Sequence, residues 1–411
     1  MSETGGRVVI VGAGHAGGSA AAFLRQFGWT GPITLIGDEP IAPYQRPPLS
    51  KAWLKGDADA ESLALRPDSF YAEESIELRL DERVGCIDRE ARRVKLKGGG
   101  FLPYDRLILA TGARARKLAL PGAELDGVLE LRTAADADRL KHALGPGKRM
   151  AVIGGGYIGL EAAASARALG ADVVVIEREP RLLARVACAA LSEFFLKCHR
   201  SHGVTFALGA ELAAIDGEDG HVSGLRFHNG DPIACDIALI GVGAIPNDDL
   251  AREAGLDCEN GIVVDLAART SDPCIHAIGD CTRRPLPLYA EMGRLESVPN
   301  ALEQAKQAAA DLCGRAPPAP EVPWFWSDQY DLKLQIAGLP IHVEETVIRG
   351  EPRFGHFAVF HLSGEGRVLC VEAVNAPAEF AGGRQLIGSR KPVALERLRD
   401  MSVPMKQVAG S

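Results

Sequence analysis

The chain has 411 residues, of which 46% are hydrophobic and 24% are charged, so a disordered or fibrous protein is excluded. At ~150 residues per domain, this length suggests two or three domains. The formal net charge of −8 argues against nucleic acid or an anionic membrane as the main partner. The 46 glycines follow no collagen-like period, and we therefore expect them at particular backbone positions.

The chain shows no signal for a membrane span or for secretion. Its polar start runs directly into an apolar stretch, without a charged and then apolar signal peptide. The most apolar stretch, residues 150–177, is interrupted by Glu161, Arg167 and Asp172. The nine cysteines are scattered and lack the C-x-x-C spacing of iron–sulfur or redox sites. We therefore expect a cytoplasmic protein without a metal site, in which any redox chemistry comes from a bound cofactor.

Residues 8–39 read as strand, glycine-rich loop, helix, strand and acid. The apolar run 8–11 predicts a strand that is buried on both faces of a parallel sheet. In the loop that follows, Gly12 permits a tight turn, Gly14 lets a pyrophosphate approach the backbone, and Gly17 lets helix and strand pack closely. The N-terminus of the helix then faces the phosphates. This segment therefore predicts a dinucleotide site.

An acid is expected to bind the ribose at the end of the second strand, residues 33–36. Asp38 and Glu39 both stand there, and we assign the role to Asp38. Asp38 could instead be a turn-forming residue, in which case Glu39 would be the ribose acid.

The same unit recurs in residues 150–177, and two dinucleotides are therefore expected. Strand 150–153 leads into Gly154, Gly156 and Gly159, and the helix and strand that follow end at the acid Glu177. A carboxylate suits the free 2′-hydroxyl of NAD and repels the 2′-phosphate of NADP. We therefore expect NADH rather than NADPH, although the neighbouring Arg178 weakens this preference.

Several further segments resemble those of a known superfamily. Apolar runs end at Leu109–Gly112, Gly243–Asn247 and Ala277–Asp280. With the two glycine fingerprints, these segments resemble the flavoprotein disulfide reductases that bind two dinucleotides. The segments Pro43–Lys51, Arg294–Ala301 and Pro323–Tyr330 narrow the resemblance to the oxygenase-coupled, NADH-dependent ferredoxin reductases, the putidaredoxin-reductase-like group. This resemblance runs from near residue 7 to the 402–406 tail.

The resemblance implies an α/β fold with two Rossmann-like dinucleotide-binding domains, arranged as in glutathione reductase, and a C-terminal α+β domain. We expect an FAD domain at 1–113 and 243–322, an inserted NAD domain at 114–242 and a C-terminal domain at 323–411. A proline-rich linker, 315–320, precedes the last domain. Its strands are expected at 333–337, 345–349, 357–361 and 367–372, followed by a helical stretch.

The resemblance also implies which residues contact each dinucleotide. The implied FAD residues are Gly12, Gly14, Ala16, Gly17, Asp38, Arg46, Lys51, Val84, Ala110, Thr111, Gly112, Arg132, Gly279, Asp280, Val298 and Trp324. The implied NAD residues are Gly154, Gly156, Tyr157, Ile158, Gly159, Glu177, Arg185 and Gly243. Arg185 could instead be a solvated surface charge, and Trp324 or Trp326 a core aromatic residue.

Lys51 and Glu161 are the predicted catalytic residues. Each is a charge in an otherwise apolar or small-residue segment that the family places at the flavin. We expect them to form an ion pair beside flavin N5, where hydride arrives from the nicotinamide. The alternative is a pair that only stabilises the fold.

The resemblance implies an external one-electron acceptor. Disulfide-reducing relatives carry a cysteine pair where this chain has Pro47–Lys51. Reduced FAD would therefore pass its electrons singly to a [2Fe–2S] ferredoxin, which would supply a cytochrome P450 or a Rieske-type oxygenase. The alternatives are an NADH:quinone or NADH:oxygen oxidoreductase, and a flavoprotein that acts through protein partners like apoptosis-inducing factor.

A ferredoxin of this kind is usually acidic, so local basic side chains would have to guide it to a chain of net negative charge. The candidate basic positions are Arg66, Arg294, Lys333, Arg349 and Arg353.

Overall fold

The structure is a computed structural model that describes residues 5–409, and its chain forms two compact units. The first unit contains the described residues up to Gln45, with Ala60–Arg114 and Ile245–Phe325. The second contains Arg46–Asp59, Ala115–Ala244 and the described residues from Trp326 onward. Two of these changes of unit lie close to the predicted boundaries of the inserted domain, but the division into three domains stays a prediction.

The first unit is built on a parallel five-stranded sheet in the order β19-β7-β1-β2-β3. These strands are β1 (Val8–Val11), β2 (Ile33–Ile36), β3 (Ile76–Arg79), β7 (Arg106–Leu109) and β19 (Ile275–Ala277). Every residue of β1 and β2 is buried, as the apolar runs predict.

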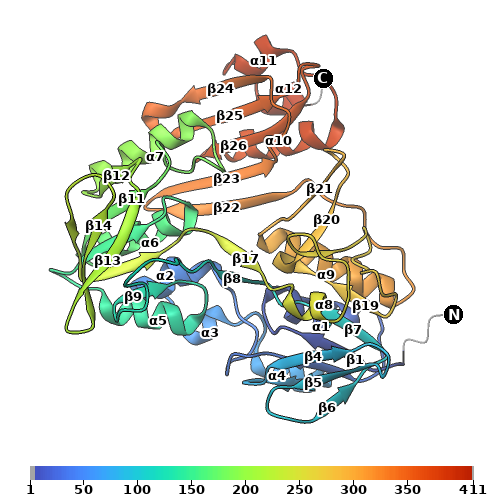
Figure 1. Ribbon diagram of the computed structural model, residues 1–411. Helices are drawn as coiled ribbons and strands as arrows, with labels where there is room; N and C mark the ends of the chain where they lie inside the picture. The colour runs from blue at the N-terminus through green and yellow to red at the C-terminus, as the bar shows by residue number, and fades with distance from the viewer. Residues whose placement is uncertain (1–4, 410–411) are drawn as a thin grey trace. The chain divides into compact units, whose positions relative to one another are not determined.

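Different layers cover the two faces of this sheet (Figure 1). On one face, Val8 and Ile10 belong to a core with α1 (His15–Gln26) and α9 (Val298–Leu312), which pack against each other. On the other face, Val9 and Val11 belong to a core that includes the small antiparallel sheet β4-β5-β6. Those strands are β4 (Val84–Asp88), β5 (Arg93–Leu96) and β6 (Phe101–Pro103). The glycines at 98–100 join β5 to β6.

The rest of the first unit consists of short elements. They are α3 (Ala60–Leu63), α4 (Asp68–Glu73), α8 (Asp249–Glu253), β18 (Ile262–Val263), the 3-10 turn η2 (Gly279–Cys281), β20 (Thr282–Leu286) and β21 (Glu291–Gly293). Strand β20 pairs with β18 on one side and with β21 on the other.

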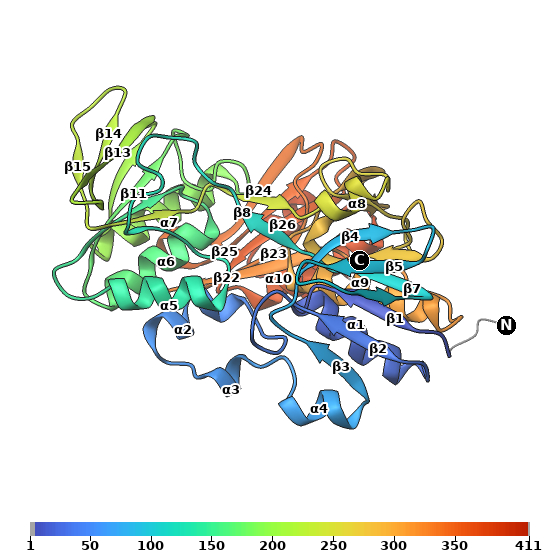
Figure 2. The ribbon, with the colours of Figure 1, turned by 60° about the horizontal axis from the view of Figure 1, so that its bottom comes forward.

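The second unit contains a parallel sheet of the same plan, in the order β12-β11-β10-β16-β9. Its strands are β9 (Val128–Glu130), β10 (Arg149–Ile153), β11 (Asp172–Glu177), β12 (Thr205–Leu208) and β16 (Ile237–Ile240). Its helices are α5 (Ala134–Ala143), α6 (Tyr157–Ala168) and α7 (Ala189–Ser201). Figure 2 shows the added antiparallel strands β13 (Leu212–Glu218), β14 (His221–Phe227) and β15 (Ile233–Ala234).

The C-terminal part of the second unit is an antiparallel sheet in the order β22-β23-β26-β25-β24, with α10 packed on β26 and β23 (Figure 1). Its strands are β22 (Trp324–Gln329), β23 (Leu332–Gly338), β24 (Glu345–Glu351), β25 (His356–Leu362) and β26 (Val368–Val374). Its helical segments are η3 (Pro352–Phe354), α10 (Pro377–Ser389), α11 (Leu395–Arg399) and α12 (Met405–Ala409). The four strands predicted after the linker and the terminal helical stretch are confirmed.

The N-terminal segment of the second unit is short and helical. It carries η1 (Pro47–Ser50) and α2 (Ala52–Lys55), which lie against α5 and α6. The chain passes between the units in β8 (Ala113–Ala115) and β17 (Ala244–Pro246), and these strands pair with each other. Among residues 5–409, no helix is both long and apolar enough to cross a membrane.

The prediction of Arg349 as a docking residue is wrong. Its side chain is only 2% exposed in β24, and its guanidinium donates to the carbonyls of Leu398, Asp400 and Val403. Three main-chain acceptors, with Glu379 as the paired carboxylate, hold this charge inside the C-terminal part of the second unit.

Candidate functional site

The first glycine-rich loop, in the first unit, has a backbone that leaves no room for a Cβ at two of its three glycines. Gly12 has φ +113°, and a Cβ at that position would lie 2.1 Å from the carbonyl oxygen of Ala110. A Cβ at Gly17 would lie 1.9 Å from the carbonyl oxygen of Gly12. At Gly14, by contrast, no described residue lies within 4 Å of an added Cβ. The loop is therefore tight on its inner side and open at Gly14, where a pyrophosphate is expected.

One ring nitrogen of the half-buried His15 at this loop has no hydrogen-bond partner among the described residues. His15 is the first residue of α1, and its Nδ1 is buried without a hydrogen-bond partner in the part of the chain that the structure describes. Burial lowers the pKa of His15, against the opposing effect of Asp280 and with a smaller lowering by Arg66. A buried ring nitrogen without a partner, beside an open loop and a helix N-terminus, fits a bound dinucleotide that supplies polar groups.

The other FAD residues predicted in the first unit differ in exposure. Val84, Ala110 and Gly279 are buried, whereas Asp38 is exposed. The alternative acid, Glu39, accepts a hydrogen bond of 2.7 Å from the hydroxyl of Tyr44. The remaining residues, Ala16, Thr111, Gly112, Asp280, Val298 and Trp324, lie at strand ends, at helix starts or in the turns between them. Their contacts with FAD stay predictions.

The second unit supplies the other predicted FAD residues. Arg46 Nη1 donates to the carbonyl oxygen of Arg132 at 2.5 Å, so the structure brings these two residues together. Lys51 follows directly after η1.

Lys51 and Glu161 form the predicted ion pair. Lys51 Nζ lies 2.5 Å from Glu161 Oε2, and the side chains are 19% and 5% exposed. The same carboxylate oxygen accepts a hydrogen bond of 2.5 Å from Ser50 Oγ. The pair therefore joins the segment before α2 to the second turn of α6, the helix that begins at the second glycine-rich loop. Its catalytic role stays a prediction.

Two serines complete the surroundings of Glu161, and sequence analysis did not single them out. Ser327 Oγ donates to Glu161 Oε1 at 2.6 Å, and Ser165 Oγ donates to the carbonyl oxygen of Ser50 at 2.7 Å. Around Lys51, the side chains of Glu161 and of the three serines, Ser50, Ser165 and Ser327, are all buried. The segment Pro323–Tyr330 was quoted for the family resemblance, but only its tryptophans were assigned roles. A polar residue at a buried strand position was the signal that could have identified Ser327.

The second glycine-rich loop repeats the backbone of the first. Gly154 has φ +112°, and an added Cβ would lie 2.4 Å from the carbonyl oxygen of Gly241. At Gly159, an added Cβ would lie 2.3 Å from the carbonyl oxygen of Gly154, whereas Gly156 faces open space among the described residues. The loop can therefore also hold a dinucleotide at a helix N-terminus.

The acid of the second loop is fixed in place by backbone amides. Glu177 accepts hydrogen bonds from the N–H of Gly155 at 2.8 Å and from the N–H of Glu179 at 2.9 Å. It therefore stands directly at the loop, where a ribose hydroxyl would meet it.

The remaining predicted NAD residues border the same loop. Tyr157 donates from its hydroxyl to the carbonyl oxygen of Val186 at 3.1 Å, and Ile158 is 48% exposed. Arg185 is exposed, and one of its terminal nitrogens lies 3.8 Å from a Cβ added at Gly243. The structure therefore brings Arg185 and Gly243 together. Because Ile158 is apolar and exposed at the start of α6, it offers a contact surface for a flat ring.

In the second unit, three side chains of types that can bind a metal ion come together. Cys188, His361 and Glu372 place one ligand atom each within 4.8 Å of one another. The carboxylate of Glu372 accepts hydrogen bonds from the N–H of Cys188 at 3.1 Å and from His361 Nε2 at 3.0 Å. Through these hydrogen bonds, Glu372 links the start of α7 to the C-terminal sheet, and no metal ion is needed to explain why the three residues are close.

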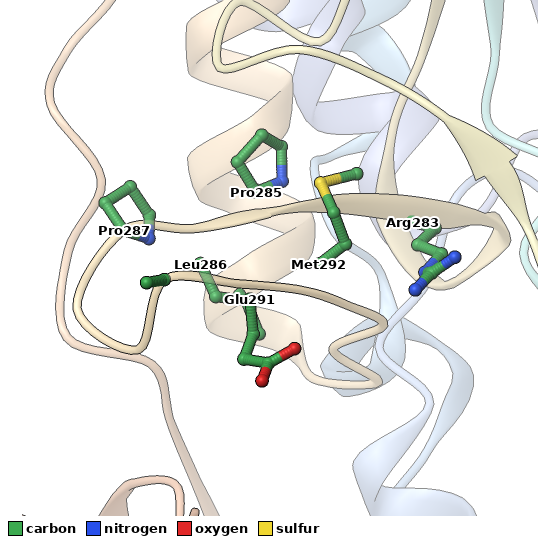
Figure 3. A pocket seen from close by; sticks show the side chains of 7 residues that line it. Arg283, Pro285, Leu286, Pro287, Glu291 and Met292 are labelled. Atoms are coloured by element: carbon green, nitrogen blue, oxygen red, sulfur yellow. The ribbon is translucent and has the colours of Figure 1, made fainter.

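A surface hollow is lined by the β20–β21 hairpin of the first unit (Figure 3). Its lining residues are Arg283, Pro285, Leu286, Pro287, Ala290, Glu291 and Met292. None of them belongs to the predicted dinucleotide contacts.

The sequence matches two family profiles and several characterised proteins. Residues 6–305 match the pyridine nucleotide-disulphide oxidoreductase family, and residues 324–409 match the reductase C-terminal family. The chain is 52% identical to a probable ferredoxin reductase, CtmF, from Castellaniella defragrans, over 98% of each chain.

Two solved structures are similar over almost the whole chain. The first is putidaredoxin reductase in a covalent complex with putidaredoxin, with 42% identity, a TM-score of 0.96 and coverage of 98% of each chain. The second is the ferredoxin reductase for the CYP199A2 system from Rhodopseudomonas palustris, with 43% identity, a TM-score of 0.95 and coverage of 98% of this chain and 99% of that chain. This chain therefore belongs to the pyridine nucleotide-disulphide oxidoreductase family, in the branch that carries the reductase C-terminal domain and contains the putidaredoxin-reductase-like enzymes.

Proposed function

We propose that the protein is an FAD-dependent NADH:ferredoxin reductase. It would pass electrons from NADH to a [2Fe–2S] ferredoxin, which would supply a cytochrome P450 or a Rieske-type oxygenase. The observation that carries this proposal is the similarity over almost the whole chain to a putidaredoxin reductase that was solved in complex with putidaredoxin. The segment Pro47–Lys51 supports it, because it contains no cysteine where disulfide-reducing relatives carry a cysteine pair.

When bound, FAD accepts a hydride from NADH and releases the two electrons one at a time. The chain's own residues would bind and orient the reactants. The two glycine-rich loops would hold the pyrophosphates at the N-termini of α1 and α6, and Glu177 would bind the adenosine ribose of NADH. Glu161 holds the ammonium group of Lys51 in one position, and we assign to this pair the fixed charge beside the reacting ring.

Variants of the ion pair test this assignment. In Lys51→Met and Glu161→Gln, we expect flavin reduction by NADH to slow by about tenfold or more, because the fixed charge at the reacting centre is lost. Stopped-flow absorbance at the flavin band measures this rate, and FAD content per chain shows whether the site is intact. Unchanged reduction rates with full FAD content would assign the pair to the stability of the fold instead.

Turnover with different acceptors tests the proposed partner. The purified protein should be yellow, should bleach with NADH far more readily than with NADPH, and should reduce a [2Fe–2S] ferredoxin faster than quinones or oxygen. Faster turnover with a quinone or oxygen would favour the direct oxidoreductase. NADH-dependent binding of a protein partner without turnover would favour a role like that of apoptosis-inducing factor.

Docking of the ferredoxin is proposed to depend on local basic side chains. Arg66, Lys333 and Arg353 are exposed. Arg353 is paired with Glu351, and Arg294 with Glu296. Raising the ionic strength should slow ferredoxin reduction and leave reduction of a neutral small acceptor nearly unchanged. An equal response of both acceptors would contradict electrostatic docking.

We also propose a cytoplasmic location, which cell fractionation with an antibody against the chain would test.

A further inference from the structure

A row of hydrogen-bonded side chains extends from Glu161 through the second unit. Ser327 Oγ lies 2.6 Å from Glu161 Oε1, and Gln329 Nε2 lies 3.1 Å from Ser327 Oγ. The carbonyl oxygen of the Gln329 side chain lies 2.8 Å from His199 Nε2. The hydroxyl of Tyr330 lies 3.1 Å from His199 Nδ1. Four consecutive hydrogen bonds therefore join Glu161 to Tyr330.

The inner members of this row are almost completely removed from water. Ser327 and Gln329 are each 1% exposed, and His199 is 0% exposed. At the outer end, the ring of Tyr330 stacks on that of the exposed His202, with ring centroids 3.7 Å apart and planes 12° apart. The row therefore runs from a buried carboxylate to the surface of the unit, and its strong internal bonds are shielded from water.

The chemistry of the groups fixes the direction of every bond in the row. A carboxylate only accepts, so the hydroxyl of Ser327 donates to Glu161. The oxygen of Ser327 then accepts from the amide N–H of Gln329, and the amide carbonyl of Gln329 accepts from His199 Nε2–H. Nδ1 of the neutral His199 is left to accept from the hydroxyl of Tyr330.

His199 is held neutral by its surroundings. The pKa of His199 is lowered to about 4. Burial is the main cause, the hydrogen bond with Gln329 opposes it, and the nearby His202 adds to the lowering. At neutral pH the ring therefore carries one proton, and the Gln329 carbonyl requires that proton on Nε2. All protons in the row point toward Glu161, while Lys51 Nζ and Ser50 Oγ donate to its other oxygen.

We propose that Ser327, Gln329 and His199 are positioning residues for the Lys51–Glu161 pair: their aligned hydrogen bonds fix the plane of the Glu161 carboxylate, and thereby hold Lys51 for hydride transfer. This inference rests on the proposed function of the pair. An amide exchanges its protons poorly in comparison with a hydroxyl or an imidazole. Gln329 therefore suits the row to fixing a charge rather than to conducting protons to the surface.

The first test uses the protein without substitutions. In 15N-labelled protein, the ring nitrogens of His199 should show the Nε2–H tautomer from pH 5.5 to pH 8, with Nδ1 unprotonated. The assignment of the signal comes from its loss in His199→Gln. The Nδ1–H tautomer would reverse the direction of the row, and a ring protonated at pH 7 would reverse its bond with Tyr330. Either result would overturn the proposal.

The second test uses paired variants at Ser327. Ser327→Ala removes the hydroxyl that donates to Glu161, whereas Ser327→Thr retains one. We expect Ser327→Ala to reduce the limiting rate of flavin reduction about tenfold with an NADH dissociation constant within about twofold, and to shift the flavin absorption band. Ser327→Thr should restore most of the rate. Equal rates in both variants and the parent, with full FAD content, would contradict the proposal.

The third test extends the row by one residue and adds a matched control. Gln329→Leu should reduce the limiting rate by a factor close to that of Ser327→Ala, and the double variant should lose little more, because both changes break one row. The control Gln385→Leu alters an exposed glutamine of α10 and should leave the rate and the flavin spectrum unchanged. Fully multiplicative losses in the double variant would mean that the two residues act independently.

These readouts separate the inference from the proposed function. Flavin reduction by NADH and the flavin spectrum involve no ferredoxin, so a failure of ferredoxin turnover would leave them informative. If the protein bound no FAD, the proposed function would fail, but the tautomer of His199 would still report the direction of the row.

Discussion

The two glycine-rich loops share a backbone but differ in how an acidic side chain can reach them. Gly12 and Gly154 have φ values of +113° and +112°, and each lies against a carbonyl oxygen that excludes a Cβ. The strands before and after each loop are also paired alike, with Val11 opposite Ile36 and Ile153 opposite Ile176. The residue after Ile36 is Gly37, whereas the residue after Ile176 is Glu177.

A single methyl group accounts for this difference. A Cβ at Gly37 would lie 2.5 Å from the Cβ of Ala13. In the second loop, Gly155 takes the place of Ala13. Leu182 Cδ2 and Glu177 Oε2 would lie 2.6 Å and 3.2 Å from a Cβ there, and the carboxylate of Glu177 accepts the N–H of Gly155. The acids that follow Gly37 stand one or two positions further on and do not occupy the equivalent site. Two loops with the same glycines can therefore present their acids differently.

The largest loss of stability should come from substituting the first glycine of each loop, Gly12 or Gly154. Gly12→Ala and Gly154→Ala combine a positive φ with a backbone clash, and we expect each to cost about 2–5 kcal/mol of unfolding free energy. Gly14→Ala and Gly156→Ala should cost little stability, because a Cβ at either position meets no other part of the chain. They should weaken FAD and NADH binding respectively, because the pyrophosphates are expected in that space. Thermal unfolding measures stability, FAD content measures FAD binding, and KM for NADH measures NADH binding. Equal stability losses in all four variants would show that the first and second glycines of a loop do not differ in this way.

A pH titration should distinguish the buried histidines of the two units. Burial lowers the pKa of His15, and lowers that of His199 to about 4. A lowered pKa means that the unfolded chain binds the proton first, so stability is retained above about pH 6.5 and falls as the pH decreases toward 4. For His199 the loss amounts to about 3 kcal/mol.

Urea unfolding between pH 7 and pH 4.5 measures this loss. His199→Gln should flatten the curve, and His15→Tyr, which introduces the second loop's residue at this position, should flatten it separately. The exposed Gln385 serves as the control, since Gln385→Leu changes no ionisable group and should leave the slope unchanged. A full slope in His199→Gln would assign the acid sensitivity to other groups.

The contact between Ala13 and Gly37 can be tested by exchanging the two small residues. Gly37→Ala should cost about 1–3 kcal/mol through overpacking. Adding Ala13→Gly should recover much of that loss, because it recreates the space found at Gly155. Chemical unfolding of the two single variants and the double variant gives the coupling energy. Independent, additive effects would show that the methyl group is not what keeps an acid out of the first loop.

The acid of the second loop should control the choice of nucleotide. Glu177→Gln is expected to raise KM for NADH about tenfold, equivalent to ~1.4 kcal/mol, and to narrow the preference over NADPH by a similar factor. FAD content should stay unchanged. Glu179→Gln is the matched control, since Glu179 contributes only its backbone N–H to Glu177. An unaltered preference in Glu177→Gln would locate nucleotide choice elsewhere.

The smallest effect should come from Ile158. In the first loop the equivalent position is Ala16, which is 8% exposed, whereas Ile158 is 48% exposed. Ile158→Ala should change stability by less than about 0.5 kcal/mol, because the side chain buries little within the chain. KM for NADH should rise two- to threefold, through lost apolar contact of about 1 kcal/mol or less. No change in KM would indicate that Ile158 does not touch the nucleotide.

The strands and loops that repeat in the sequence could be predicted because their signals are local. An apolar run such as 8–11 predicts a buried strand, and glycines at fixed spacing predict a tight loop, because both depend only on neighbouring residues. The resemblance to the family gave the partnership of Lys51 with Glu161, which are far apart in the chain. Both kinds of prediction agree with the structure, although the roles assigned to the residues stay predictions.

Other features depend on space that a sequence pattern does not express. Both acids were expected at the ends of their second strands, but the methyl group of Ala13 makes the two positions different. Arg349 looked like a surface charge because the carbonyls that surround it come from a later segment of the chain. Ser327, Gln329 and His199 were missed because strand β22 and helix α7 meet only in the folded protein.

The parallel sheet of the first unit has a consequence for synthesis on the ribosome. Its edge strand β19 pairs with β7, with Ile275 opposite Leu107, yet the whole segment 115–244 is translated between them. The sheet of that intervening segment is complete once β16 has emerged. We therefore expect the later-translated sheet to fold first, while the N-terminal strands wait for their last neighbour, and Gly279 and Asp280 arrive later still. Loading of the first dinucleotide would then be among the last events of the protein's maturation.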